Sequence, residues 1–282
     1  MRMVSAAILV IVGCSNERPP QPVDRSDDDG IELLLDGFGP RSVLQYQLTK
    51  STSSTIQIEL DYDLTAPGMG GRLPTSVTEL QIAAEDVQPE GARIRTTIVR
   101  VSSRDRDGMT TSRDAFDRAM AQLEGISYVG TLARDGRLPD LHVDATGKGL
   151  PPALAKQIGD STKSFQELTL RLPHEPISVG ALWRYSGPIG PAELGLIATT
   201  TVIVTSLDGN KLGFVLASKA EPGPGPSKLP SELAGFQLTG AGIGAGVADL
   251  SRMVRTGSQT FELHSTGGEP IALITTTRFT PR

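Results

Sequence analysis

Residues 54–64, STIQIELDYDL, decide the fold class of this 282-residue chain. Ile, Leu and Tyr side chains alternate strictly with Gln, Glu and Asp side chains along this stretch. Successive side chains of a strand point to opposite faces of a sheet, so the alternation predicts a strand with one buried and one wet face. Such a strand is typical of an antiparallel sheet that is covered on one side. The stretch therefore predicts a β-rich fold.

The same alternation recurs along most of the chain. It predicts further strands at 44–48, 76–88, 92–101, 196–206, 211–219, 234–248, 258–265 and 270–280. A hairpin is expected over 126–145, turning at Asp135-Gly136, because this pair is a preferred two-residue turn. Trp183 follows a turn and begins another strand, so we expect it to be a buried packing residue.

Two segments have a helical period instead. Residues 113–124 are apolar at intervals of three and four, between a plausible N-cap at Ser112 and a stop at Gly125. The second segment, 152–170, begins after Pro151, and four apolar residues share one face. These four residues are Leu154, Ile158, Phe165 and Leu168.

The order of these elements predicts a mainly β (α+β) chain with one domain over 36–282. We expect a strongly curved antiparallel sheet, or half-barrel, with the two amphipathic helical segments on its concave face. Two stacked sandwich-like halves are the alternative. Residues 14–35 are rich in proline and acidic side chains and poor in apolar ones, so they are expected to form a disordered tether.

The amino-terminal segment resembles that of bacterial lipoproteins. The apolar run from Met3 to Val12 is shorter than the ~20 residues that a spanning helix needs, which favours a signal peptide over residues 1–13. Ile11-Val12-Gly13-Cys14 resembles a lipobox, and Cys14 is the only cysteine of the chain. The resemblance implies lipidation of Cys14, which would anchor the chain in a membrane. Ser15 follows the cysteine where an Asp would mean retention at the inner membrane in enterobacterial lipoproteins, so the resemblance favours the outer membrane of a Gram-negative bacterium.

Several classes of function find no support in the sequence. The net charge is −5 and no basic stripe is present, which argues against nucleic-acid binding. His174 lacks the second histidine of a zinc-protease motif, since Ser178 stands at that position. The triple aspartate at 27–29 does not have the spacing of a calcium loop. We therefore expect no metal, no cofactor and no enzymatic activity.

The glycine-rich segment 239–246, TGAGIGAG, does not have the spacing of a dinucleotide loop. Its period of two places Gly240, Gly242, Gly244 and Gly246 on one face of a strand. A face without side chains permits sheet bending, close packing of a helix, or contact with a ligand. The ligand-binding residues expected on this reading are Gly240, Gly242, Gly244, Phe165 and Leu168.

Residues 172–185, LPHEPISVGALWRY, resemble a segment of an uncharacterised family of bacterial putative lipoproteins. Ala181-Leu182 departs from the polar pair usual in that family. The order of elements also resembles the half-barrel of periplasmic and mycobacterial lipoprotein carriers, which hold acyl chains between sheet and helices. The resemblance implies a lipid or another hydrophobic ligand in the half-barrel. The alternative is a structural or protein-interaction module of the cell envelope with a filled core and no ligand.

Overall fold

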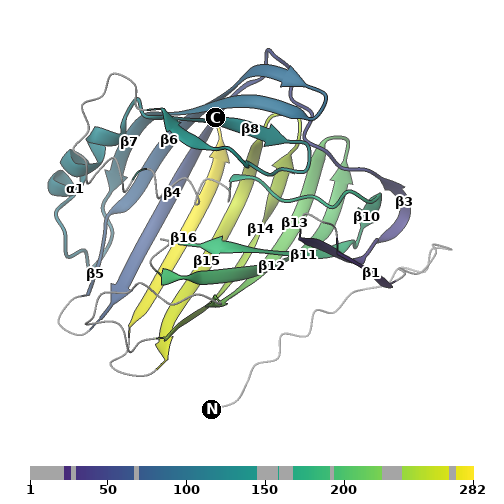
Figure 1. Cartoon of the computed structure of the whole chain (residues 1–282). Helices are drawn as coiled ribbons and strands as arrows, with labels where there is room; N and C mark the ends of the chain where they lie inside the picture. Colours follow the sequence, from purple (N-terminus) through teal and green to yellow (C-terminus); the bar gives the residue numbers. More distant parts are fainter. Residues whose placement is uncertain are drawn as a thin grey trace.

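The computed structural model describes residues 22–26, 30–66, 70–144, 158, 168–190, 194–223, 237–266 and 271–282. Most of these residues belong to one large antiparallel sheet (Figure 1). In spatial order its strands are β1 (Pro22–Ser26), β2 (Ile31–Leu35), β11 (Leu182–Ile189), β12 (Leu196–Asp208), β13 (Lys211–Pro222), β14 (Gln237–Asp249), β15 (Val254–Thr266), β16 (Ala272–Pro281), β4 (Ser53–Thr65), β6 (Thr75–Gln88), β7 (Gly91–Arg104), β8 (Ser127–Ala133) and β9 (His142–Asp144).

Three short strands lie outside this path. β5 (Gly71–Arg72) pairs with β4, and β3 (Phe38–Ser42) pairs with β10 (Ile177–Val179) in a separate two-stranded sheet. The one α-helix within the described residues is α1 (Arg113–Met120), which continues into the 3₁₀ turn η1 (Ala121–Leu123). The fold is thus mainly β, as the alternation predicts.

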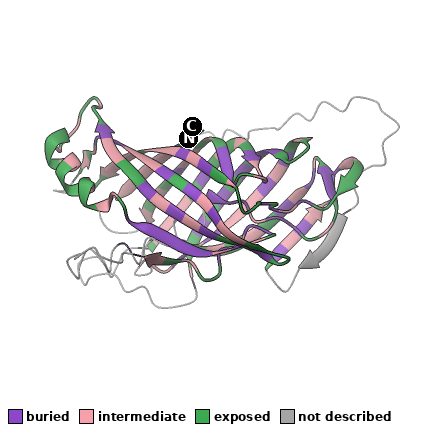
Figure 2. Ribbon diagram, turned by 90° about the horizontal axis from the view of Figure 1, so that it is seen from above, coloured by how far each residue is buried: buried purple, intermediate pink, exposed green. Residues whose placement is uncertain are grey.

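The large sheet is strongly curved and does not close into a barrel. Buried and exposed residues alternate along its long strands (Figure 2). One hydrophobic core contains Ile31 of β2, Val202 of β12 and Ile94 of β7, although β7 is far from the other two strands in the sheet. Only a sheet that curls upon itself brings them together. We call the face that carries these residues the inner face, and the opposite face the outer face.

One end of the inner face is closed by two segments of the chain. The inner segments are residues 43–49 and 169–172, and their Leu and Tyr side chains belong to the main core. The Tyr46 amide donates to the Arg134 carbonyl after β8, and the Gln47 amide donates to the Leu250 carbonyl after β14. The inner segments therefore tie together strand ends from the two sides of the curved sheet. We call this the closed end.

Residues 44–48 are consequently not the strand that their alternation predicts. Leu44, Tyr46 and Leu48 are buried as expected. The backbone, however, bonds to the turns of two different strands rather than to one neighbour, so no ladder forms. Alternation reports which side chains are buried, and it does not identify the partner of the backbone.

The expected tether over 14–35 is wrong for its last part. Residues 31–35 form β2, which pairs with β11, and Ile31 and Leu33 are fully buried on the inner face. Pro22–Ser26 pairs with β2 as β1. The domain therefore begins before residue 36, because this short apolar segment pairs with β11 and buries its apolar side chains. Cys14 and residues 27–29 lie outside the described residues.

The prediction of a helix over 113–124 with an N-cap at Ser112 is confirmed, but its predicted location on the concave face is wrong. The Ser112 hydroxyl accepts from the Ala115 amide at 3.3 Å, as an N-cap does. The helix nevertheless contains no buried residue, and it lies beside β7 at a corner of the sheet rather than on the concave face (Figure 1). The inner segments occupy part of that face instead. Most of the region 152–170, including Phe165, lies outside the described residues.

Candidate functional site

The candidate site lies on the inner face, on the side away from the closed end, where the side chains form successive cross-strand rows. The register places Gly187 of β11, Ala198 of β12, Ala220 of β13 and Gly240 of β14 side by side. These four residues form the small-residue row. The next row toward the closed end contains Tyr185, Thr200 and Ser218, and the row after that begins with Trp183. Along β11, β12 and β13 the rows thus change from small to polar to apolar.

The closed end is packed by the Trp183 row. Trp183 is completely buried, and its indole nitrogen donates to the Arg171 carbonyl at 2.8 Å. The Tyr46 hydroxyl accepts from the Leu170 amide at 3.0 Å, and burial raises the pKa of this tyrosine. Trp183 is therefore a packing residue, as predicted, and this end of the inner face is filled by the chain itself.

Beside the small-residue row lies a cavity of about 160 Å³, which we call the apolar chamber. Its walls come from two parts of the curved sheet that face each other across β13 and β14. Ile189 and Leu196 contribute from β11 and β12, and Phe261, Leu263 and Leu273 contribute from β15 and β16. A dry cavity of ~150 Å³ with such a lining holds a benzene-sized group, so the chamber is large enough for a piece of a hydrocarbon chain.

The glycine face of β14 explains how this chamber is built. The four glycines share one face of β14, as predicted, and this face points inward, while Ile243 on the other face is 70% exposed. A Cβ on Gly242 would lie 2.5 Å from Cδ2 of Phe261, and one on Gly240 would lie 2.7 Å from Cδ2 of Leu263. Side chains of β15 therefore lie over these glycines. Those side chains, not the glycines, line the chamber.

Two of the remaining predicted site residues, Gly244 and Leu168, do not line the chamber. Gly244 faces Gln259, since a Cβ there would lie 3.1 Å from Cβ of Gln259. Leu168 is buried in the main core and does not line the apolar chamber. Phe165 is outside the described residues. The structure thus brings Gly240 and Gly242 close to the chamber and places Leu168 away from it.

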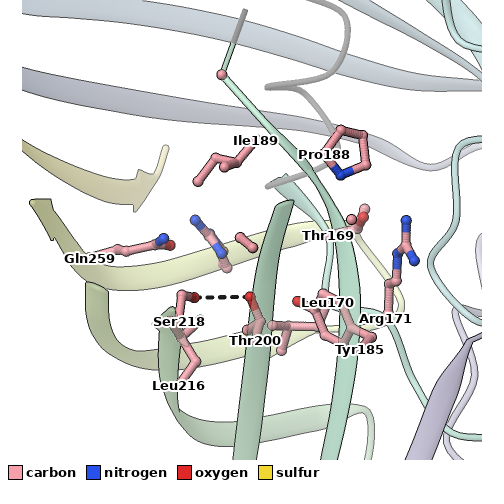
Figure 3. Close-up of a pocket in the computed structure, with 14 residues that line it drawn as sticks. Thr169, Leu170, Arg171, Tyr185, Pro188, Ile189, Thr200, Leu216, Ser218 and Gln259 are labelled. Carbon is pink, nitrogen blue, oxygen red and sulfur yellow. Dashed lines mark hydrogen bonds between the residues drawn. The ribbon is translucent and has the colours of Figure 1, made fainter. Parts of the chain in front are cut away.

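A second cavity, of about 90 Å³, adjoins the chamber on the side of the closed end (Figure 3). We call it the polar pocket. Thr200 and Ser218 lie on neighbouring strands with their hydroxyl oxygens 2.9 Å apart, and Gln259 points toward the pocket from β15 (Figure 3). Arg171 and Arg255 also line it. These residues were missed in the sequence, although Arg255, Gln259, Phe261 and Leu263 share one parity in the strand that contains them.

The two arginines of the polar pocket are held over aromatic rings. The Arg255 guanidinium carbon lies 3.6 Å from the ring centre of Phe279, and that of Arg171 lies 5.4 Å from the ring centre of Tyr185. A cation over an aromatic face is attracted by the ring quadrupole. This contact helps to keep the Arg255 side chain, which is 4% exposed, within the inner face.

The acidic pair Asp61 and Asp63 lies on the outer face, as the alternation predicts. Burial raises the pKa of Asp61, but hydrogen bonds from Thr75 at 2.6 Å and Arg278 at 2.9 Å outweigh it, and so the pKa falls below its ordinary value. Arg106 also pairs with both carboxylates. The pair belongs to an ion network on the sheet surface.

Within the described residues, no three His, Cys, Asp or Glu side chains gather as metal ligands would. No helix in the same ranges has the length and apolarity needed to cross a bilayer.

No protein-family model matches the sequence, and no curated protein matches it either. A solved structure of lipovitellin, described as showing lipid–protein interactions in that protein, is similar in fold with a TM-score of 0.50. The two chains are 10% identical, and the match covers 83% of this chain and 25% of the lipovitellin chain. This chain therefore spans about a quarter of that protein, and the similarity is one of fold.

Proposed function

We propose that this chain is an exported lipoprotein whose half-barrel binds a lipid or another hydrophobic ligand. The observation that carries the proposal is the apolar chamber on the inner face, which the protein's own side chains line without filling. A cavity with an apolar lining and a few polar groups beside it is the usual form of a small-molecule site. The fold similarity to lipovitellin supports the same reading. The role is binding rather than catalysis.

The experiment that tests this proposal is native mass spectrometry of the purified full chain, followed by extraction and identification of non-covalent lipid. We expect a hydrophobic molecule to accompany the protein. Thr275 lines the chamber, so Thr275→Phe should fill it and abolish the bound molecule. Thr276→Phe on the outer face of the same strand is the matched control and should retain it. If the original chain carries no lipid and takes up none, the binding proposal is refuted.

The proposal includes a membrane anchor at Cys14 in the cell envelope, and specifically in the outer membrane of a Gram-negative bacterium. Replacement of the thiol removes the site of acylation, so Cys14→Ala should move the protein from the membrane fraction to the soluble fraction. Ser15→Ala leaves the thiol in place and should remain with membranes. Fractionation followed by immunoblotting measures both. Persistence of Cys14→Ala in the membrane fraction with an acyl label would contradict the anchor.

A structural or protein-interaction module is the second candidate. It is favoured by the packed closed end and by the aliphatic side chains on the outer face of β13 and β14. Val215 and Val247 are each 39% exposed beside Ile243. This candidate predicts no bound lipid and no effect of Thr275→Phe on function, so the experiment above separates the two.

A further inference from the structure

The polar pocket and the apolar chamber adjoin each other. Ile189, Gly190 and Gln259 line both cavities. One cavity is polar and the other is apolar, and they lie side by side along the inner face. A ligand that occupies both must therefore have a polar end and a hydrocarbon end.

The polar pocket offers hydrogen-bond donors. Thr200 and Ser218 carry two hydroxyl protons between them and use one in their mutual bond, so the other proton can be donated into the pocket. Within the described residues, the Gln259 side-chain amide has no hydrogen-bond partner, and it adds two N–H groups. An acceptor group on a ligand would meet these donors from β12, β13 and β15.

Two arginines contribute positive charge to the lining of the polar pocket. Arg171 and Arg255 are its charged lining residues, and no acidic side chain of the described residues lines it. A positive charge in a partly enclosed cavity, where the dielectric constant is lower than that of water, attracts anions more strongly than the same charge in water does. Donors and positive charge together favour a negatively charged head group over a neutral or cationic one.

We infer that the ligand is an anionic single-chain amphiphile, whose carboxylate or phosphate head lies in the polar pocket and whose chain enters the apolar chamber. This inference rests on the proposed function and specifies its ligand class. The volumes agree with it, since about 90 Å³ accommodates a small head group and about 160 Å³ accommodates part of one chain. The positions of the two cavities fix the orientation of the ligand. Its head group lies toward Thr200 and Ser218, and its hydrocarbon chain lies toward Leu263.

The test uses titration calorimetry at pH 8 on the full chain carrying Cys14→Ala. Because this variant lacks the site of acylation, it can be measured without detergent. The probes share one chain length: dodecanoate, dodecyl phosphate, dodecanol and dodecyltrimethylammonium, each below its micelle concentration, with inorganic phosphate alone as a fifth. Dodecanoate and dodecyl phosphate should bind about tenfold more tightly than dodecanol, or better. Equal binding of dodecanol, or equal binding of inorganic phosphate and dodecyl phosphate, would overturn the inference. Failure of every twelve-carbon probe to bind would refute the proposed function itself.

Variants then assign the preference to the pocket. Thr200→Val with Ser218→Ala removes the donor pair, and Gln259→Leu removes the amide, so each should reduce the advantage of the anionic probes several-fold without changing dodecanol binding. The matched control is Ser186→Ala with Thr199→Val, which removes a hydroxyl pair 2.8 Å apart on the outer face. Arg255→Lys should retain more of the preference than Arg255→Met. If the preference is the same in all inner-face variants that fold by circular dichroism, the head group does not lie in this pocket.

Discussion

At the scale of single residues, Trp183 shows how one large side chain organises the closed end. It combines complete burial with a hydrogen bond from its indole nitrogen to the Arg171 carbonyl, which belongs to an inner segment. Its neighbours in the row are Leu33 and Val202, on the strands to either side. Trp183 thus joins the sheet to the inner segment that covers it.

We expect Trp183→Ala to lower the free energy of unfolding by ~3–5 kcal/mol, because it leaves a large cavity and an unbonded carbonyl. Urea unfolding measures this loss, with Val215→Ala on the outer face as the control that should change little. The intact protein should emit tryptophan fluorescence well to the blue of tryptophan in water. Emission at the wavelength of the free amino acid would contradict the burial of Trp183.

Gly242 shows the opposite case, in which the absence of a side chain is the essential property. A Cβ at this position would lie 2.5 Å from Phe261 and 3.1 Å from the Thr260 carbonyl oxygen. Gly242→Ala should therefore destabilise the protein by ~1–3 kcal/mol through overpacking. Gly242→Ala together with Phe261→Leu should cost less than the sum of the two single changes. Urea unfolding measures the free energies of this double-mutant cycle. If the two losses of stability are additive, the Phe261 ring does not fill the space over Gly242.

At the scale of elements, β2 shows how a short segment that reads as part of a linker becomes part of the sheet. Its Ile31 and Leu33 side chains are buried on the inner face. On the outer face, the Glu32 carboxylate accepts two hydrogen bonds from the Arg184 guanidinium of β11, at 2.5 and 2.9 Å. A strand held by burial on one face and a bidentate ion pair on the other is integral to the domain.

The stability of the domain should therefore depend on β2. Ile31 is 1% exposed, so Ile31→Ala should cost ~2–5 kcal/mol and lower the melting temperature by several degrees. Val43→Ala is a suitable control, because Val43 is 45% exposed. Calorimetry of the two variants decides the matter. If Ile31→Ala has the same melting temperature as the unaltered chain, residues 31–35 are dispensable for the fold, as a tether would be.

At the scale of the whole molecule, the outer face carries a network of ion pairs along β4, β6 and β7. Hydrogen bonds from Arg95 lower the pKa of Glu85, and the Thr131 amide lowers that of Asp140. The pKa of Asp61 is lowered as well. A carboxyl group whose pKa is lower in the folded state than in the unfolded state binds fewer protons when folded, so it stabilises the fold above its unfolded pKa.

We therefore expect the stability contributed by these carboxylates to be complete at pH 7 and to be lost as the pH falls below about 4, through the folded pKa values. Urea unfolding midpoints at pH 7, 5 and 3 measure this loss. Asp61→Asn should be less stable than the original chain at pH 7, and the difference should shrink at pH 3. Asp208→Asn, at the exposed end of β12, is the control. A difference for Asp61→Asn that is constant with pH would contradict the role of its charge.

The sequence predicts the strands well where burial and pairing are governed by the same alternation. β4, β6, β7 and β12 to β16 lie close to their predicted ranges, because each is a long strand with one wet face. Prediction fails for residues 44–48 and for β2. Both are short apolar runs, whose place depends on which edge or turn remains available after the long strands have paired.

What the sequence determines by itself is local: which residues are buried together along each strand, that Gly240 to Gly246 face one way, and that Ser112 caps a helix. These properties follow from side-chain alternation and from short-range hydrogen bonds. Only the tertiary structure decides that Phe261 covers Gly242, that Thr200 meets Ser218, and that Arg255 and Gln259 face one pocket. The reason is that register between strands and curvature of the sheet place these residues together, and neither property is encoded in the period of any single strand.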